Sequence, residues 1–484
     1  MVTSIWAANL VWILLLLNWL LEGRWTEKWR MARESRLLHA FLVLYLMHVI
    51  GLLWTSNMPH GLEVLQVKLP LLFVPTVMLT SRPVEGTARR NILWFYGFTV
   101  IVVSIIGMVR LLTIHDLPYR YAVPYISHIR FALNCCMVIC LCLHGIGHST
   151  HQLRYLLLLP VVWMLAFILL LHSYTAVVVL AVVSLLILLL RWRRWPLIAL
   201  WAVLAGGLLF MTGHEIKSYY RLVPMAQEPL QAYTAGGRPY THACDGIIEN
   251  GNYINNYLCR EEMRAEWTHR STLPYDSLTA SGYSVESTLT RYLNALGLTK
   301  DSVGVNTLTD NQIADIEEGV ANPVYRSHNP IRKMVYVMLL EREFHRHTHA
   351  SAGFTMLQRF EMWGTTLHIV GQHPWLGVGT GDVDDELQAA LFREDSELAG
   401  SSLRSHNQYL SLLAAFGVVG LLLLAIFFLR ATPAMRYQPA LLLALLFTIL
   451  ISCLTEDTLD TLAGQLFCLW FIAFRQTPCT NTTH

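Results

Sequence analysis

Long apolar stretches decide the fold class, and the clearest is residues 406–429, HNQYLSLLAAFGVVGLLLLAIFFL. No Asp, Glu, Lys or Arg interrupts this stretch. A helix needs about 20 apolar residues to cross the roughly 30 Å of hydrocarbon in a bilayer. The stretch therefore predicts a membrane-spanning helix that begins at His406.

The composition of the whole chain also points to lipid as its surroundings. Of the 484 residues, 54% are hydrophobic and only 14% are charged, whereas soluble domains carry about 25% charged residues. The mean hydropathy is +0.43. A net charge of +2 gives no reason to expect nucleic acid as a partner, so we expect membrane lipid instead.

Similar apolar stretches recur along the chain, and we count about eleven spans. The third is the weakest, because Lys68 and Pro70 interrupt it. The first has neither a basic leading region nor a cleavage site, so we interpret it as a span rather than a signal peptide. The predicted spans lie near residues 4–21, 37–55, 66–81, 91–111, 128–147, 154–172, 174–190, 196–212, 406–429, 439–455 and 459–474. The predicted fold class is an all-α polytopic membrane protein.

The short loops alternate in charge, and this alternation predicts the orientation. Lys and Arg are enriched in cytoplasmic loops. Basic residues fill the loops at 22–36, 81–90 and 191–194 and follow the ninth span, whereas the loops at 56–66, 172–174 and 456–459 hold none. The N-terminus is then outside and the C-terminus inside. The long polar segment 213–405 falls on the outer side, which is the periplasm of a bacterial cell.

Residues 213–405 are long enough for a small domain of their own. We therefore predict an N-terminal bundle of about eight spans in 1–212, a periplasmic loop domain in 213–405, and a C-terminal bundle of about three spans with a short tail in 406–484. Capping-box spacing at Thr309 and Gln312 predicts a short helix near 310–318. Apolar periodicity predicts further helices at 284–298, 331–344 and 354–371.

The two cysteines of the polar segment, Cys244 and Cys259, lie fifteen positions apart. An oxidising compartment favours a disulfide between them, and two free thiols are the alternative. The other cysteines, apart from Cys479 in the tail, lie in apolar runs and are interpreted as small buried hydrophobes.

His406 is the first candidate for catalysis, because it begins a span at the outer membrane boundary. An unperturbed histidine titrates near pH 6.5 and can accept a proton at neutral pH. As a general base, such a group raises a rate by about 10²–10⁴-fold. The alternative is an interfacial histidine that caps the helix or contacts headgroups.

Several cations lie near the same boundary and could hold a phosphate group. Arg359 lies in the last predicted helix before the span, and an arginine offers a planar fork of donors to phosphate oxygens. Cations at the ends of spans are functional candidates, and snorkelling to lipid phosphate is the alternative for each. The weaker candidates are Arg130, Arg221 and Lys68.

A glycine-rich turn lies between Arg359 and His406. Pro374 ends the preceding helix, and Gly377, Gly379 and Gly381 follow at alternate positions. Exposed amide groups in such a turn can form an anion-binding nest. A simple turn explains the pattern equally well.

The run from Arg359 to Asn407 resembles the C-terminal signature of the O-antigen ligase and polymerase superfamily of bacterial membrane glycosyltransferases. The elements that match are the arginine before the span, the Pro-x-x-Gly-x-Gly turn, and Ser405-His406-Asn407 at the start of the span. Their place after one large outer loop matches too. The chain departs from the family in having about eleven expected spans, where family members often have twelve.

The resemblance implies an inverting transferase that uses no metal and no cofactor. Its donor would be a glycan linked to undecaprenyl pyrophosphate, and its acceptor a sugar hydroxyl on lipid A–core. The enzyme would lie in the bacterial inner membrane with its active site facing the periplasm. By this analogy His406 assists deprotonation of the acceptor hydroxyl and Arg359 holds the pyrophosphate. Arg130, Arg221, Lys68, Asn407, Gly377 and Gly379 are the expected substrate-binding residues.

Other interpretations are less favoured. A glycan polymerase or a protein O-oligosaccharyltransferase uses the same donor with another acceptor, and a transporter would need paired broken helices that are not evident. The acidic run Asp382-Val383-Asp384-Asp385 could hold a metal, although Asp382 also fits a turn. His345, His347 and His349 are interpreted as part of a solvated loop, and Glu456 and Asp457 as part of a hydrated outer turn.

Overall fold

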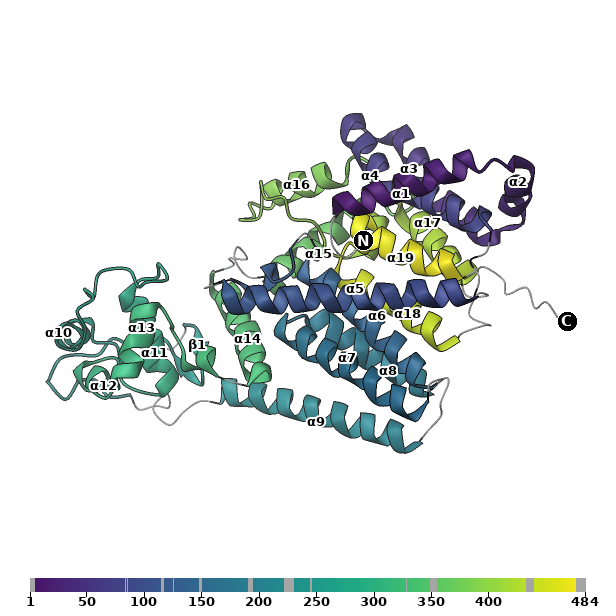
Figure 1. Cartoon of the computed structure of the whole chain (residues 1–484). Coiled ribbons are helices and arrows are strands. Elements are labelled where there is room, and N and C mark those ends of the chain that lie inside the picture. The colour runs from purple at the N-terminus through teal and green to yellow at the C-terminus, as the bar shows by residue number, and fades with distance from the viewer. Residues whose placement is uncertain are drawn as a thin grey trace. The chain divides into compact units, whose positions relative to one another are not determined.

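The computed structural model describes residues 5–82, 84, 86–114, 117–124, 126–147, 150–189, 195–221, 230–243, 246–327, 329–348, 355–431 and 439–475. The chain divides into two compact units. The first consists of Met1–Ile198 together with Glu361–His484, and the second of Ala199–Phe360. Helices dominate both units, and the described residues form one sheet, of two short strands. Figure 1 shows the helices of each unit.

Helices build the first unit, and most of them are long and apolar. They are α1 (Ile5–Leu21), α2 (Trp25–Glu34), α3 (Arg36–Gly51), α4 (Met58–Thr80), α5 (Gly86–Thr113), α6 (His128–Gly147), α7 (His151–Leu170), α8 (Tyr174–Ile187), α16 (Val383–Arg393), α17 (Gln408–Ala431), α18 (Pro439–Thr455) and α19 (Leu462–Arg475). Short 3₁₀ turns follow α3 and α18, namely η1 (Leu52–Trp54) and η7 (Thr458–Asp460). α9 (Trp195–Tyr220) and α15 (Thr355–Gln372) cross from one unit to the other.

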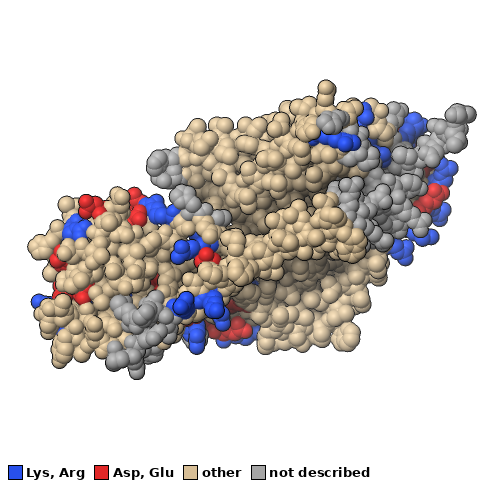
Figure 2. Space-filling model, turned by 90° about the horizontal axis from the view of Figure 1, so that it is seen from below, with Lys and Arg blue, Asp and Glu red and all other residues tan. Residues whose placement is uncertain are grey.

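Seven helices are long and apolar enough to cross a membrane within the part of the chain that the structure describes. Three shorter apolar helices accompany them, at Leu10–Leu21, Tyr174–Ile187 and Leu443–Thr455. In Figure 2 the flanks of the helices show very few charged side chains, whereas Lys and Arg gather at the end where α2 lies. The chain is therefore a mostly helical multi-pass membrane protein. The count of about eleven spans and the orientation stay predictions.

α4 begins earlier than the sequence suggested. We predicted a loop over 56–66 and a span from residue 66, but the helix starts at Met58. Asn57 caps it, because its side-chain oxygen accepts a hydrogen bond from the backbone N–H of His60 at 3.1 Å. The capped first turns extend the span outwards, so polar residues that were assigned to a loop lie on a helix.

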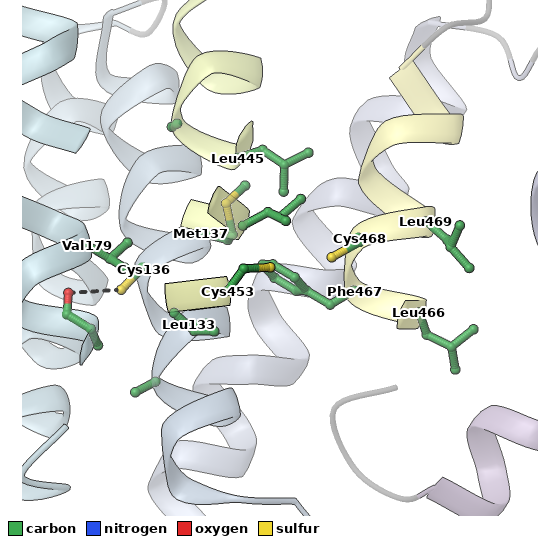
Figure 3. Close-up of a cluster of buried hydrophobic side chains, with 14 of the residues drawn as sticks. Leu133, Cys136, Met137, Val179, Leu445, Cys453, Leu466, Phe467, Cys468 and Leu469 are labelled. Carbon is green, nitrogen blue, oxygen red and sulfur yellow. Dashed lines mark hydrogen bonds between the residues drawn. The ribbon is translucent and has the colours of Figure 1, made fainter. Parts of the chain in front are cut away.

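Small and sulfur-containing side chains pack the centre of the first unit. Figure 3 shows Cys136 and Met137 of α6 beside Cys453 of α18 and Cys468 of α19. The Cys136 thiol donates to the backbone oxygen of Ala176 at 3.6 Å. These buried cysteines act as small hydrophobes, as predicted.

α17 is interrupted at Gly417, whose φ of 60° and ψ of −158° are not helical. An unbroken helix would bond the amides of residues 418 and 419 to the carbonyls of residues 414 and 415. Here the amides of Val378 and Gly379 donate to those two carbonyls, each at 2.9 Å. In turn, the amides of Val418 and Val419 donate to the carbonyls of Pro374 and Trp375, at 2.9 and 3.4 Å. The glycine-rich turn thus replaces both missing hydrogen bonds of the span.

The second unit has a polar helical domain with its own core. Its elements are β1 (Ile248–Glu249), β2 (Asn252–Tyr253), α10 (Arg260–Arg270), α11 (Val285–Leu296), α12 (Ser302–Asn306), α13 (Asp310–Glu318), η5 (Pro323–Arg326) and α14 (Pro330–Thr348). Trp267 and Tyr292 are buried at its centre. The predicted helices are confirmed as α11, α13, α14 and α15, and α13 has the predicted capping box with Gly319 as its C-cap.

Two histidines of the second unit lie on a helix, and one of its cysteines is buried. His345 and His347 lie in the last turn of α14, so the solvated loop predicted there is wrong. The amphipathic helix simply runs further than its apolar face indicated. Cys259 is buried, whereas Cys244 and His349 lie outside the described residues. The disulfide therefore stays a prediction.

Candidate active site

His406 lies just before α17 in a backbone conformation that is rare for a side-chain-bearing residue, with a φ of 48°. Its Nδ1 is 3.7 Å from Oδ2 of Asp457, and its side chain is 39% exposed. Strained conformations of this kind cluster at functional sites, because the surrounding structure must hold them. The ring is therefore held between solvent on one side and a carboxylate on the other.

Asp457 comes from the short connection between α18 and η7, about fifty positions after His406 in the sequence. Its side chain is only 7% exposed, and its Oδ1 accepts a hydrogen bond from the Ser411 hydroxyl at 3.0 Å. Burial and the neighbouring Asp460 carboxylate raise the pKa of Asp457 to about 6. The hydrated turn predicted for Glu456 and Asp457 is wrong, because both side chains are buried.

Asn407 is the N-cap of α17. Its side-chain oxygen accepts hydrogen bonds from the backbone N–H groups of Tyr409 and Leu410, at 3.1 and 3.2 Å. The Ser405 hydroxyl lies 2.9 Å from that of Ser411. This cap holds the start of the helix in place, and with it the backbone on both sides of His406.

A cavity of about 210 Å³ opens beside this helix start. Ser405, Gln408 and Ser411 line it, although His406 is not among its lining residues. Ser411 therefore lines the cavity and also donates a hydrogen bond to Asp457. The remaining walls come from α3, α4, α15, α16, further residues of α17, and Thr380, Arg404 and Asp460. Its polar and charged lining residues are His48, His60, Glu63, Lys68, Thr366, Thr380, Asp384, Arg404, Ser405, Gln408, Ser411 and Asp460.

Lys68 lies on one wall of the cavity with its charge already paired. Its side chain is 3% exposed and forms an ion pair with Asp460, and its ammonium donates to the backbone oxygen of Leu459 at 2.7 Å. Gln408 donates to the same Asp460 carboxylate at 3.0 Å. Attraction to the Lys68 ammonium holds the pKa of Asp460 below its usual range despite burial. The structure thus brings Lys68 into the cavity through a buried polar network.

Arg404 is the cation that the sequence analysis missed. It lines the cavity, and its guanidinium donates to Oδ2 of Asp384 at 2.7 Å. His60 Nε2 lies 3.4 Å from the same carboxylate oxygen. The only sequence signal was its place two residues before His406, and this carries little weight without the fold.

The glycine turn packs closely against its neighbours. Added Cβ atoms would meet backbone atoms of α17 at 2.3 Å for Gly377, and the Thr55 hydroxyl at 2.5 Å for Gly379. Both glycines also have positive φ, of 64° and 103°. The amide of Gly377 donates to the carbonyl of His373, and that of Gly379 to α17. These amides are engaged within the protein, so the geometry supports a packing role and no anion-binding nest.

Asp382 is likewise engaged with the backbone. Its two carboxylate oxygens accept the amides of Ser56 and Asn57, each at 2.7 Å. This arrangement fits the turn interpretation. Among the residues that the structure describes, no group of three or more His, Cys, Asp or Glu side chains is arranged to hold a metal ion.

The three predicted arginines are not among the residues that line this cavity. Arg130 lines a small pocket with Asn134 and Thr458, and its Nε is buried without a hydrogen-bond partner in the described part of the chain. Arg221 and Arg359 belong to the second unit, whereas His406 belongs to the first. The pairing of Arg359 with His406 therefore stays a prediction.

Residues 319–425 match a family model described as O-antigen ligase. In this segment the chain is similar to the O-antigen ligase family. The matched segment contains Arg404, His406, Asn407 and the glycine turn, whereas Lys68 and Asp457 lie outside it. No curated protein matches the chain. The segment that matches the family model thus supplies one side of the candidate site, and helices before and after it supply the rest.

Proposed function

We propose that this O-antigen ligase family member transfers a glycan from undecaprenyl pyrophosphate to a sugar hydroxyl of lipid A–core at the periplasmic face of the inner membrane. The observation that carries the proposal is the pairing of His406 with the buried carboxylate of Asp457, next to a cavity lined by Arg404 and Lys68. A base and a set of cations are what this transfer requires. No metal or cofactor is needed for either role.

His406 acts as the general base on the acceptor. The Asp457 carboxylate favours the ring tautomer that carries its proton on Nδ1, because that atom faces it at 3.7 Å. In that tautomer Nε2 carries no proton, and it accepts the proton of the acceptor hydroxyl as that oxygen attacks. The carboxylate also stabilises the imidazolium that forms, as the aspartate of a catalytic triad does.

The cations stabilise the negative charge of the leaving group. As the acceptor oxygen bonds to the anomeric carbon, the bond from that carbon to the pyrophosphate oxygen breaks, and the electron pair leaves with undecaprenyl pyrophosphate. Fixed cations stabilise the charge that develops there. Arg404 is the first candidate, since a phosphate oxygen can replace Asp384 as its partner. Lys68, Arg130, Arg221 and Arg359 remain further candidates. Direct displacement inverts the configuration at the anomeric carbon.

Transfer by purified full-length protein, with lipid-linked donor and lipid A–core acceptor, tests the role of His406. His406→Ala should lower kcat by about 10²–10⁴-fold, because a general base contributes that much. His39→Ala is the matched control, since His39 is an exposed histidine of α3 in the same unit. Unchanged turnover in His406→Ala would rule out the base.

The acceptor is tested separately, in a strain that lacks the gene. Mass analysis of lipid A–core, free glycan and glycoproteins shows which glycan linkage disappears. Loss of the glycan on lipid A–core is the expected result. Loss of long glycan chains on the carrier lipid would identify a polymerase, and loss from glycoproteins a protein O-oligosaccharyltransferase.

A further inference from the structure

The second unit has a cavity of its own, of about 290 Å³, where the end of α9 meets α14. Figure 1 shows these two helices converging beside β1. Glu215 and Tyr219 come from α9, Arg332 and Tyr336 from α14, and Arg221 follows α9 directly. The volume is near the lower end of the range for small-molecule sites, which is about 300–1,000 Å³. A group the size of a monosaccharide fits it.

The charged residues described around this cavity are mostly basic. Arg221 and Arg332 line it, and Glu215 is the one lining carboxylate among the described residues. Arg332 Nε lies 3.7 Å from that carboxylate, and its side chain is 58% exposed. Guanidinium groups bind carboxylates and phosphates through paired hydrogen bonds. The cavity is therefore suited to a ligand with one negative charge or more.

The floor of the cavity is aromatic and rigid. The Tyr219 hydroxyl donates to the backbone oxygen of Ile248 at 3.0 Å, and the Tyr336 hydroxyl donates to Glu249. Both rings are thereby fixed in orientation, and both are at least 96% buried, at 4% and 3% exposure. Aromatic side chains with a few convergent polar groups are typical of small-molecule sites. A ring-shaped polar ligand can lie in such a cavity while its anionic group contacts the arginines.

We propose that this cavity binds an anionic saccharide, namely a sugar that carries a carboxylate or a phosphate. Naming a sugar rests on the proposed function, whereas the preference for an anion rests on the arginines alone. All of its lining residues belong to the second unit, whereas those of the candidate active site belong to the first. It would recognise the acidic sugars of a glycan substrate.

The test is a saturation-transfer NMR titration of the detergent-solubilised full-length protein. The probes are glucuronic acid and glucose 6-phosphate, with glucose as the neutral control. Both acidic sugars should bind, and glucose should bind at least about tenfold more weakly, as expected when a charge-assisted hydrogen bond is lost. Equal binding of all three sugars would overturn the proposal.

Substitutions distinguish binding in the cavity from non-specific binding to charge on the protein surface. Arg221→Gln should weaken binding of the acidic probes about tenfold or more, whereas Arg260→Gln on exposed α10 should not. Ala295→Trp should abolish binding by filling the cavity while leaving both arginines in place. Binding that survives Ala295→Trp in a folded variant, judged by an unchanged melting temperature, would contradict the proposal.

Two further experiments test whether the cavity binds a lipid headgroup instead, and whether binding depends on the candidate active site. Phosphatidylglycerol in nanodiscs should not displace glucose 6-phosphate from the wild-type protein. Displacement would identify a lipid headgroup as the occupant and overturn the saccharide. The His406→Ala variant should bind both acidic sugars as tightly as the wild type does. The binding experiment therefore stays informative even if His406 is not the catalytic base.

Discussion

In the proposed mechanism, the Asp457 carboxylate stabilises the protonated form of the His406 ring. Burial places the pKa of Asp457 at about 6, above its ordinary value of 3.8. In the folded protein this group is therefore ionised above about pH 6 and takes up a proton below it. Only the ionised form supports an imidazolium at His406, so the two groups act as a pair.

This pair makes the transfer rate sensitive to pH. The value of kcat/KM should fall as the pH is lowered through about 6, because protonation removes the negative charge that stabilises the imidazolium. Asp457→Asn should lower the rate at pH 7.5 by about 10²-fold or more. The fall of kcat/KM near pH 6 should also disappear in this variant, because asparagine does not take up a proton. Profiles of wild type and variant that superimpose after scaling would show that Asp457 does not act through His406.

Asn407 offers a second test at the level of single residues. If its role is to cap α17, Asn407→Ser should keep both stability and activity, since serine is also a good N-cap. Asn407→Ala should cost about 1 kcal/mol of stability. Thermal unfolding and KM measurements distinguish the roles: a raised KM in the stable Asn407→Ser variant would assign its amide to the substrate.

Sequence reasoning found the residues of this site only where a local pattern marks them. His406 was predicted from its motif at the start of a span. Lys68 was predicted as a weaker candidate from its place at the end of a span. Asp457 joins His406 only through folding, and a pattern of neighbouring residues carries no information on such a distant partner. Arg404 was missed because an exposed arginine beside a histidine looks like any other charged residue at a membrane boundary.

At the level of elements, the junction between α17 and the glycine turn is the feature most open to test. Gly377→Ala should lower the free energy of unfolding by about 2–4 kcal/mol, because the new Cβ would overlap the backbone of α17 and the positive φ disfavours a side chain. Unfolding in mixed micelles measures this loss.

The matched control is Gly371→Ala, at a glycine of α15 whose Cβ would meet no atom within 4 Å. Alanine there should be neutral or stabilising by up to about 1 kcal/mol, since it favours the helix. Equal effects of the two substitutions would mean that the turn does not need glycine at residue 377.

The sequence predicted most helices but not this junction. Apolar length and caps determine where α11, α13 and the long spans lie, and these signals are local. The break at Gly417 needs a partner segment that fills it, so a wholly apolar stretch was read as one continuous helix. The early start of α4 was missed because hydrophobicity alone does not register a capping asparagine.

At the level of the whole molecule, the alternation of charged loops predicts which side each segment faces. Thr272→Cys in the polar segment should react with a membrane-impermeant maleimide in intact spheroplasts, whereas Arg33→Cys in the first basic loop should react only after lysis. Both side chains are exposed, so accessibility does not limit either reaction. Cys244→Ser combined with Cys479→Ser serves as the background, because the tail cysteine could otherwise react after lysis. The reverse labelling pattern would invert the topology.

The sequence predicted the character of the two units but not the boundary between them. A polar helical domain and an apolar bundle were both evident from composition. The segment at 361–405 was predicted to belong to the outer loop, whereas in the structure it packs within the first unit. Its amphipathic helices have the same pattern as those of the polar domain, and only their tertiary partners separate them.

The hydrogen bonds exchanged between α17 and residues 374–379 bear on how the protein is made. Lipid offers no replacement for an unpaired peptide group, so a helix with a gap at Gly417 is poorly suited to enter the bilayer alone. The segment that fills the gap precedes α17 in the chain and leaves the ribosome first. Biogenesis of this span is thus expected to depend on an already translocated stretch that folds back to meet it, and deleting that stretch should leave the nascent helix to quality-control proteolysis.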